Sequence, residues 1–164
     1  MYNASPALTF TLADAIVLLT ERPDLLPRLS SWASPVPVTV TSPADVARIV
    51  TPMIGGADVE NLVVIPLDSR ARVLGATVLT IGSVGHTVFP IPGILRHVLT
   101  YPTARAFVVA HNHPSGDCIP SADDIRVTAS LSRACVAVEL QFQDHVIVTP
   151  GGAWTSLVAS GYFR

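Results

Sequence analysis

Two hydropathy patterns alternate along this chain: short apolar segments rich in β-branched residues, and longer segments whose apolar residues recur every three to four positions. The first pattern is typical of strands and the second of helices. The expected strands are 60–67, 72–81, a short one ending at 88, 107–110 and 137–148. The expected helices are 12–20, 43–50, 92–100 and 121–134, with a helical turn after Trp154, which we expect to plug the edge of the core. This mixture predicts an α/β fold with a mixed, partly antiparallel sheet flanked by helices.

The prolines suggest where the main domain begins. Residues 1–37 hold one expected helix followed by Pro23, Pro27, Pro35 and Pro37, and we expect them to form an accessory arm. Residues 38–164 are then the main domain, opened by Ser42 and Pro43, a good start for a helix because serine caps free amides and proline is tolerated at the first helical position.

Composition narrows the classes of partner. The 164 residues include 10 arginines and no lysine, and 12 acidic residues bring the net charge to −2. Proteins that bind a phosphate backbone usually cluster a basic excess, so this balance disfavours nucleic acid as the main ligand. The apolar runs are far shorter than a membrane span, and we expect a cytoplasmic protein without a membrane anchor. In a reducing compartment Cys118 and Cys135 are expected as thiols.

The strongest chemical signal begins at the end of the expected strand 107–110. His111 and His113 are two residues apart, so both side chains point to one side of the strand while that of Asn112 points away. A hydrolytic zinc site needs three protein ligands and a position for water, and Asp124 in the first turn of the next helix is the best third ligand. Ser121 and Asp124 alone have the spacing of a helix capping box. The histidine pair beside them, with a loop rich in proline and glycine between, favours a Zn²⁺ site completed without Cys118.

Zinc hydrolases also need a carboxylate that accepts a proton from water. Of the three glutamates, Glu21 lies in the arm, Glu139 in the strand after the site helix, and Glu60 at the start of the first expected strand. Spacing alone does not decide between Glu60 and Glu139.

At these positions the chain resembles a known family. His111-Asn112-His113-Pro114-Ser115-Gly116 followed by Pro120-Ser121-Ala122-Asp123-Asp124 is similar to the JAMM signature of the JAB/MPN metallopeptidases. Asn112, the Pro-Ser-Gly turn, the Asp144-His145 pair and Ser42-Pro43 look like the RadC branch in particular. The resemblance covers about 40–160 and implies a cytidine deaminase-like sheet flanked by helices.

The resemblance also implies roles for single residues. It implies that Glu60 is the catalytic glutamate and that the Ser121 hydroxyl stabilises the developing oxyanion. We expect His145 to support the ligands from behind, as Asn112 does, rather than to bind the metal. One departure is that Ile91 and Pro92 stand where RadC proteins usually have an Arg-Glu pair.

The resemblance leaves two main functions open. The first is a zinc metallopeptidase or isopeptidase that acts on a peptide or a modified protein. The second is a DNA-repair-associated protein that binds nucleic acid or a repair partner, as the RadC name suggests, although the charge and the absence of a recognisable helix-hairpin-helix in 1–37 disfavour it. A base deaminase is disfavoured because Ser115 stands where its glutamate is expected.

Overall fold

The computed structural model describes residues 38–81 and 89–162. The expected helix 12–20, the arm 1–37 and the strand ending at 88 lie outside this part of the chain. The described elements are α3 (Pro43–Ile54), β1 (Asn61–Leu67), β2 (Thr77–Ile81), α4 (Ile91–Leu99), β3 (Ala106–Asn112), α5 (Ala122–Val136), β4 (Gln141–Val148) and β5 (Trp154–Ser156).

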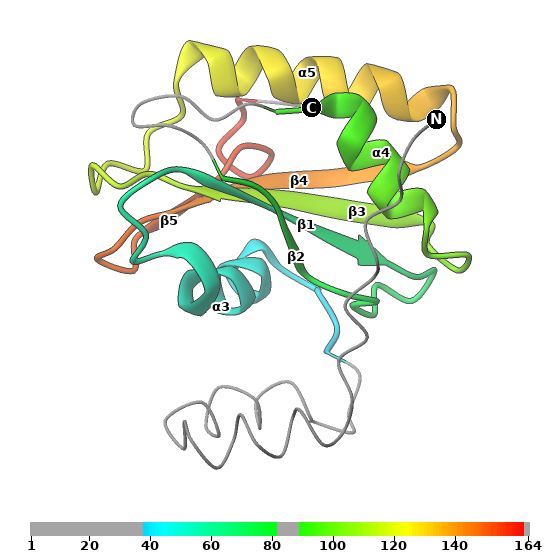
Figure 1. Ribbon diagram of the computed structural model, residues 1–164, viewed down its shortest axis with the longest axis horizontal. Helices are drawn as coiled ribbons and strands as arrows, with labels where there is room; N and C mark the ends of the chain where they lie inside the picture. The colour runs from blue at the N-terminus through cyan, green and yellow to red at the C-terminus, as the bar shows by residue number, and fades with distance from the viewer. Residues whose placement is uncertain (1–37, 82–88, 163–164) are drawn as a thin grey trace, which may run out of the picture. The chain divides into compact units, whose positions relative to one another are not determined.

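The five strands form one mixed sheet in the order β2-β1-β3-β4-β5. β3 and β4 are parallel, and the other neighbouring pairs are antiparallel. Helix α3 covers one face of the sheet, and α4 and α5 cover the other (Figure 1). The α/β class and the mixed sheet expected from the sequence are therefore confirmed.

The central strands are buried on both faces because each face has its own helical cover. Every residue of β1 and β3 is buried. Their side chains alternate between two cores: Val63, Val108 and Ala110 pack with α3, while Phe107 and Val109 pack with α4 and α5. This double burial explains why both segments read as continuous apolar runs rather than as alternating ones.

A one-residue bulge in β4 changes which face its side chains occupy. Phe142 is the register partner of Phe107, but the next partner, Val108, faces Asp144, so Gln143 is skipped. Beyond the bulge, Asp144 lies on the α3 face and His145 on the α5 face. The bulge thus sends His145 toward the helix that carries Asp124.

Two strand boundaries differ from the sequence-based expectation. The expected strand 72–81 is strand only over Thr77–Ile81, because Asp68 accepts hydrogen bonds from the backbone amides of Arg70 and Arg72 and holds a tight turn in which Ala71 has φ 57°. Residues Arg72 and Val73 form only isolated bridges.

The expected strand 137–148 begins at Gln141 instead. The carbonyl of Cys135 accepts from the amides of Val138 and Leu140, and Glu139 between them has φ 54°. The residues that were expected to start the strand therefore form the turn that ends α5.

The C-terminal segment also differs. Trp154 begins β5, which pairs with β4, and the expected helical turn comes after this strand, where the amide of Ser160 donates to the carbonyl of Ser156. The Trp154 side chain is 40% exposed and does not plug the core edge. The expected helix 43–50 is confirmed and extends to Ile54, with Pro52 in its last turn.

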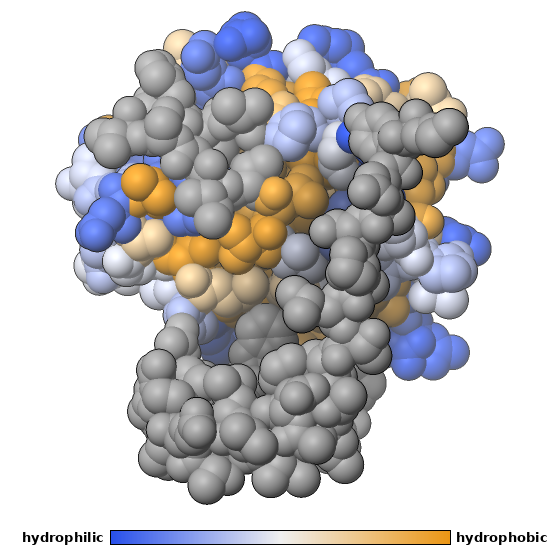
Figure 2. All heavy atoms as spheres, viewed as in Figure 1, coloured by the Kyte–Doolittle hydropathy of each residue, from blue (hydrophilic) through white to orange (hydrophobic). Residues whose placement is uncertain are grey.

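The surface of this domain carries some apolar side chains. Figure 2 shows hydrophobic residues gathered across the middle of the viewed face, over the sheet, with hydrophilic residues around the rim. Val78 on the edge strand β2 is among the exposed apolar residues. Within the described residues, no helix combines the length and apolar character that crossing a bilayer requires.

Candidate metal centre

The alternation of β3 places its final residues in the centre. Phe107 and Val109 face the α5 side, and His111, two residues further, continues on that side and is fully buried. His113 follows the end of β3, and its backbone amide donates to the carbonyl of Val148 on β4. The expectation that the two imidazoles meet on one side matches their position, since their Nε2 atoms lie 2.9 Å apart.

Asp124 reaches the histidines from the first turn of α5. One carboxylate oxygen lies 3.3 Å from His111 Nε2, and the other lies 3.5 Å from His113 Nε2. The same residue forms a capping box with Ser121, whose hydroxyl accepts from the Asp124 amide at 3.1 Å. The capping role and the approach to the histidines therefore coexist, because the cap fixes the carboxylate where the helix begins.

The spacing of these atoms suits one metal ion. His111, His113 and Asp124 form a group whose ligand atoms could hold a single ion. In a tetrahedral site with bonds of about 2.0 to 2.1 Å, two ligand atoms are about 3.3 Å apart. The separations of 2.9, 3.3 and 3.5 Å lie around that value. Among the described residues this is the one such group, and Cys118 is not part of it.

The outer nitrogens of both imidazoles are already engaged. His113 Nδ1 lies 2.7 Å from the carbonyl oxygen of Asp117, which can only accept, so Nδ1 carries the proton. His111 Nδ1 lies 2.7 Å from His145 Nε2. If His111 Nδ1 also carries its proton, lone pairs at two Nε2 atoms and a carboxylate face one point. Such a convergence of acceptors is stable only around a proton or a metal cation.

The pKa directions agree with a shared proton in the metal-free protein. The hydrogen bond with Asp124 raises the pKa of His113 above 6.5, against an opposing effect of burial. Burial lowers the pKa of His111 well below 6.5, and the neighbouring His145 acts in the same direction. Burial raises the pKa of Asp124, but its contacts with His113, His111 and Ser121 together hold it below 3.8. A metal ion bound here would therefore compete with one proton that His113 and Asp124 share.

A cleft of about 680 Å³ lies beside the three ligands. Glu60, Ser121, His113 and Asp124 all line it, together with Phe89 and the outer face of the first turns of α5. The negative charge of Glu60 contributes to the raised pKa of His113. The serine and the glutamate implied by the resemblance thus line the same cleft as His113 and Asp124.

Glu139, the alternative to Glu60, lies elsewhere. It is exposed in the turn before β4. β4 runs parallel to β3, and His111 and His113 lie at the C-terminal end of β3, so a whole strand, about 20 Å, separates the turn from these two histidines. β1 is antiparallel to β3 and begins beside His111, which brings Glu60 to the correct end of the sheet.

Two further residues named from the sequence lie behind the ligands. Asn112 is fully buried, and its side chain hydrogen-bonds the backbone of Asn61, Val59 and Ala57. His145 is fully buried and touches His111 but not the group of three ligand atoms. Burial lowers the pKa of His145 to about 4, so it is a neutral ring at physiological pH.

Sequence reasoning missed Thr128 and Phe89. The Thr128 hydroxyl lies 2.6 Å from His145 Nδ1, although the two residues are seventeen positions apart. The ring of Phe89 meets those of His111 and His145 edge-on, with centroids 5.5 and 5.2 Å apart. A threonine inside a helix and a lone phenylalanine give no signal of such contacts.

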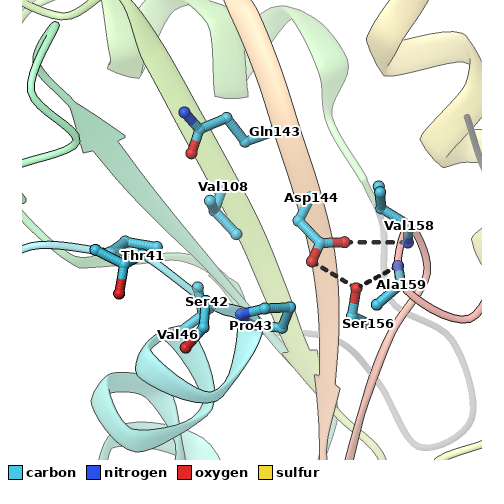
Figure 3. Close-up of a pocket in the computed structure, with 11 residues that line it drawn as sticks. Thr41, Ser42, Pro43, Val46, Val108, Gln143, Asp144, Ser156, Val158 and Ala159 are labelled. Carbon is cyan, nitrogen blue, oxygen red and sulfur yellow. Dashed lines mark hydrogen bonds between the residues drawn. The ribbon is translucent and has the colours of Figure 1, made fainter.

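A second cavity, of about 250 Å³, lies on the α3 face of the sheet (Figure 3). Asp144 points toward Ser156 there, accepting from its hydroxyl at 2.6 Å and from the amides of His145 and Val158. Burial raises the pKa of Asp144. These bonds tie β4 to the turn after β5, so the carboxylate has a structural explanation.

The fold and the ligand group define a class. A sheet covered by α3 on one face and by α4 and α5 on the other, with two histidines at the end of a central strand and an aspartate at the start of the next helix, is an α/β domain with a JAMM-like metal site. The family of RadC-like JAB domains matches residues 40–162, and the chain belongs to that family.

Curated relatives agree with this assignment. A UPF0758 protein of Staphylococcus aureus strain NCTC 8325 is 31% identical over 126 residues, which are 77% of this chain and 57% of the relative. A UPF0758 protein of Acinetobacter baumannii strain ATCC 17978 is 37% identical over 100 residues, which are 61% of this chain and 42% of the relative. The chain thus spans about half the length of the curated relatives it matches.

Proposed function

We propose that the chain is a zinc-dependent hydrolase that cleaves amide bonds, a peptidase or isopeptidase of the JAMM type. One observation carries the proposal: Nε2 of His111, Nε2 of His113 and the carboxylate of Asp124 converge within 2.9 to 3.5 Å while both Nδ1 atoms have other partners. Three acceptors without a proton of their own are a ligand set for a cation.

The chemistry of the donors favours zinc. Two imidazole nitrogens and one carboxylate oxygen are a common set for catalytic zinc, which leaves a fourth position for water. Magnesium and calcium prefer oxygen ligands, and the described residues offer no second carboxylate within the group. The ligand set therefore resembles that of a hydrolytic centre rather than a closed structural site.

The residues around the ligands have separable roles in the proposed reaction. A bound zinc ion would supply the Lewis acidity that makes water a nucleophile near neutral pH. Glu60, on the wall of the same cleft, accepts a proton from the attacking water and returns it to the leaving amine. Its place immediately before β1 keeps it on the wall of the cleft that His113 and Asp124 also line.

Ser121 supplies a hydroxyl for the oxygen on which charge develops. In the metal-free geometry this hydroxyl donates to Asp124 at 2.6 Å. It must turn from Asp124 toward the cleft to serve the reaction, and metal binding favours that turn because the carboxylate then has a cation as its partner. Its capping bond is compatible with the turn, because there the hydroxyl oxygen accepts.

The cleft suits a peptide or a modified protein as substrate. It is open, and its wall combines the apolar Phe89 and Val127 with the Asp123–Arg126 ion pair. An extended peptide offers both apolar and polar groups to such a wall. Nucleic acid remains the weaker candidate because the net charge of −2 provides no basic surplus for phosphates.

The test combines metal analysis with a peptide-library cleavage assay. Glu60→Gln should abolish turnover while zinc stays near one per chain, and Glu139→Gln, a matched change at the far end of the sheet, should leave both unchanged. His113→Ala should lose zinc and turnover together. Purified wild type that binds no zinc, or equal loss of cleavage in both glutamine variants, would overturn the proposal.

A further inference from the structure

Beyond the three ligands, a line of hydrogen bonds connects the backbone of one ligand to the ring of another. Thr128 Oγ1 lies 2.6 Å from the carbonyl oxygen of Asp124 and 2.6 Å from His145 Nδ1. His145 Nε2 lies 2.7 Å from His111 Nδ1. The line begins on the Asp124 backbone in α5, crosses to β4 and ends on β3.

The first bond fixes the direction of the others. A carbonyl oxygen can only accept, so the single hydroxyl proton of Thr128 points to Asp124. The Thr128 oxygen then has only lone pairs to offer His145, and its close contact with Nδ1 requires that Nδ1 carries a proton. A threonine that bonds back to the carbonyl four residues earlier is common in helices. Here that bond also determines how a second residue is protonated.

His145 passes this direction to the metal ligand. It is fully buried, with the ring of Phe89 packed edge-on against it, and a neutral imidazole carries one proton. With that proton on Nδ1, Nε2 is an acceptor and His111 must donate from Nδ1. The lone pair of His111 is then on Nε2, the atom that faces His113 and Asp124.

We propose that Thr128 and His145 are positioning residues that lock His111 in the tautomer with its proton on Nδ1, so that Nε2 is bare and ready for a metal ion. The inference rests on the metal site proposed above. His113 achieves the same state more simply, since its Nδ1 donates to a backbone carbonyl. For His111 the acceptor is the neutral ring of His145 instead of a carbonyl. That ring accepts at Nε2 only while its proton stays on Nδ1, where it is bonded to the Thr128 hydroxyl.

This line of hydrogen bonds, called the relay below, also couples the position of α5 to the tautomer of His111. Both of its ends belong to proposed ligands, since it begins at the backbone carbonyl of Asp124 and ends at the ring of His111. The side-chain carboxylate of Asp124 belongs to the group of three ligands. A shift of α5 along the sheet would break the Thr128 bonds and the metal geometry together. Loss of the hydroxyl alone should therefore alter the tautomer of His111 before it alters the fold.

The decisive experiment uses the full chain without metal and reads the tautomer of each histidine by NMR of the imidazole nitrogens. In the wild type, His111 and His145 should both be protonated on Nδ1 alone. Thr128→Val removes the hydroxyl with little change in volume and should give mixed tautomers at both rings. Thr128→Ser keeps the hydroxyl and should restore the wild-type pattern.

Zinc affinity, measured by competition with a chelator, is the second readout. Thr128→Val should bind zinc about 10- to 100-fold more weakly, and Thr128→Ser close to wild type. Thr149→Val is the matched control, because this buried threonine also donates to a carbonyl, that of Ala153, but lies outside the relay. It should lower thermal stability without changing either tautomer.

Wild-type His111 with its proton on Nε2 would overturn the inference without any mutation. The test therefore does not depend on whether a variant folds. Unchanged tautomers and zinc affinity in folded Thr128→Val would overturn it as well. If the tautomers are as expected but wild type binds no zinc, the lock stands and the proposed function fails. If zinc binds and the tautomer is wrong, only the lock fails.

Discussion

The side-chain oxygen of Asn112 accepts a hydrogen bond from the backbone amide of Asn61 at 2.7 Å, immediately beside Glu60. The nitrogen of the same side chain donates to the carbonyls of Val59 at 3.0 Å and Ala57 at 3.3 Å. One buried amide at the end of β3 thus holds the segment that carries Glu60. The strand that supplies His111 to the candidate metal site also sets the position of the proposed proton acceptor.

Asn112→Asp should separate these two functions of β3. A carboxylate has the same shape but cannot donate to two carbonyls, so we expect a loss of about 1 to 3 kcal/mol in the free energy of unfolding. Turnover should fall because Glu60 is no longer held, while zinc affinity stays near that of the wild type. Denaturant unfolding, a zinc titration and the cleavage assay measure the three effects. A loss of zinc as large as in His113→Ala would instead assign Asn112 to the ligand site.

Zinc binding should depend on pH through the proton that His113 and Asp124 share. The pKa of His113 is raised above 6.5, so below that raised value zinc must displace a proton, and affinity should rise by up to about tenfold per pH unit. Above it the affinity should level off. Chelator competition from about pH 5.5 to about pH 9, with calorimetry in two buffers to count released protons, tests this. Affinity that is constant across the range contradicts it.

The same pKa has the opposite consequence for the metal-free protein. Because the folded state holds the His113 proton more tightly than the unfolded state, this group stabilises the fold fully below pH 6.5. That contribution disappears as pH rises through the raised value. Unfolding curves of metal-free wild type and His113→Ala should therefore converge with rising pH, and curves that run parallel would exclude the shared proton.

The two capping boxes allow a matched comparison. Ser121 begins α5 beside the metal ligands, and Ser42 begins α3 on the other face, each with an aspartate three residues later. Ser121→Ala and Ser42→Ala should each cost about 1 kcal/mol of stability. Only Ser121→Ala should change zinc affinity and turnover, because its hydroxyl also bonds the Asp124 carboxylate. If the two variants behave equally in the zinc titration, Ser121 serves only as a helix cap and has no role in the metal site.

Asp144→Asn should change how stability varies with pH. Burial raises the folded-state pKa of Asp144 above 3.8, so the folded state binds its proton more tightly. The contribution of this group therefore falls as pH rises from 3.8 through the raised value. The unfolding free energy of Asp144→Asn relative to wild type should improve between about pH 3 and about pH 7. The exposed Asp123→Asn serves as control, and equal slopes for the two variants would contradict the effect.

The candidate metal site was largely predictable because its signals are local. His111 and His113 follow an apolar strand, and Asp124 lies at a capping position, so spacing alone brought out the group. Spacing did not favour Glu60 over Glu139. That choice required either the family resemblance or the antiparallel pairing of β1 with β3, which is a long-range property.

The errors have a common physical cause. Val73, Val138 and Leu140 are apolar and pack against the two cores, yet none lies in a named strand. These residues lie in or beside turns, in which the Asp68 carboxylate and the Cys135 carbonyl accept hydrogen bonds from backbone amides. Hydropathy indicates that a residue is buried but not whether its backbone hydrogen-bonds to a neighbouring strand or within a turn. The predicted strand boundaries were therefore wrong where turns contain core residues.

The skipped residue Gln143 has a consequence for comparing sequences across this family. Side chains after it occupy faces opposite to those that a regular strand of the same residues would give them, so Asp144 and His145 owe their places to the bulge at Gln143. A homologue that keeps a residue at this position but pairs it as part of a regular strand could keep the Asp-His pair in an alignment and yet present the histidine to α3. Conservation of the Asp-His pair would then conceal the loss of the support behind His111, so the register of β4 beside β3 is the feature to examine first.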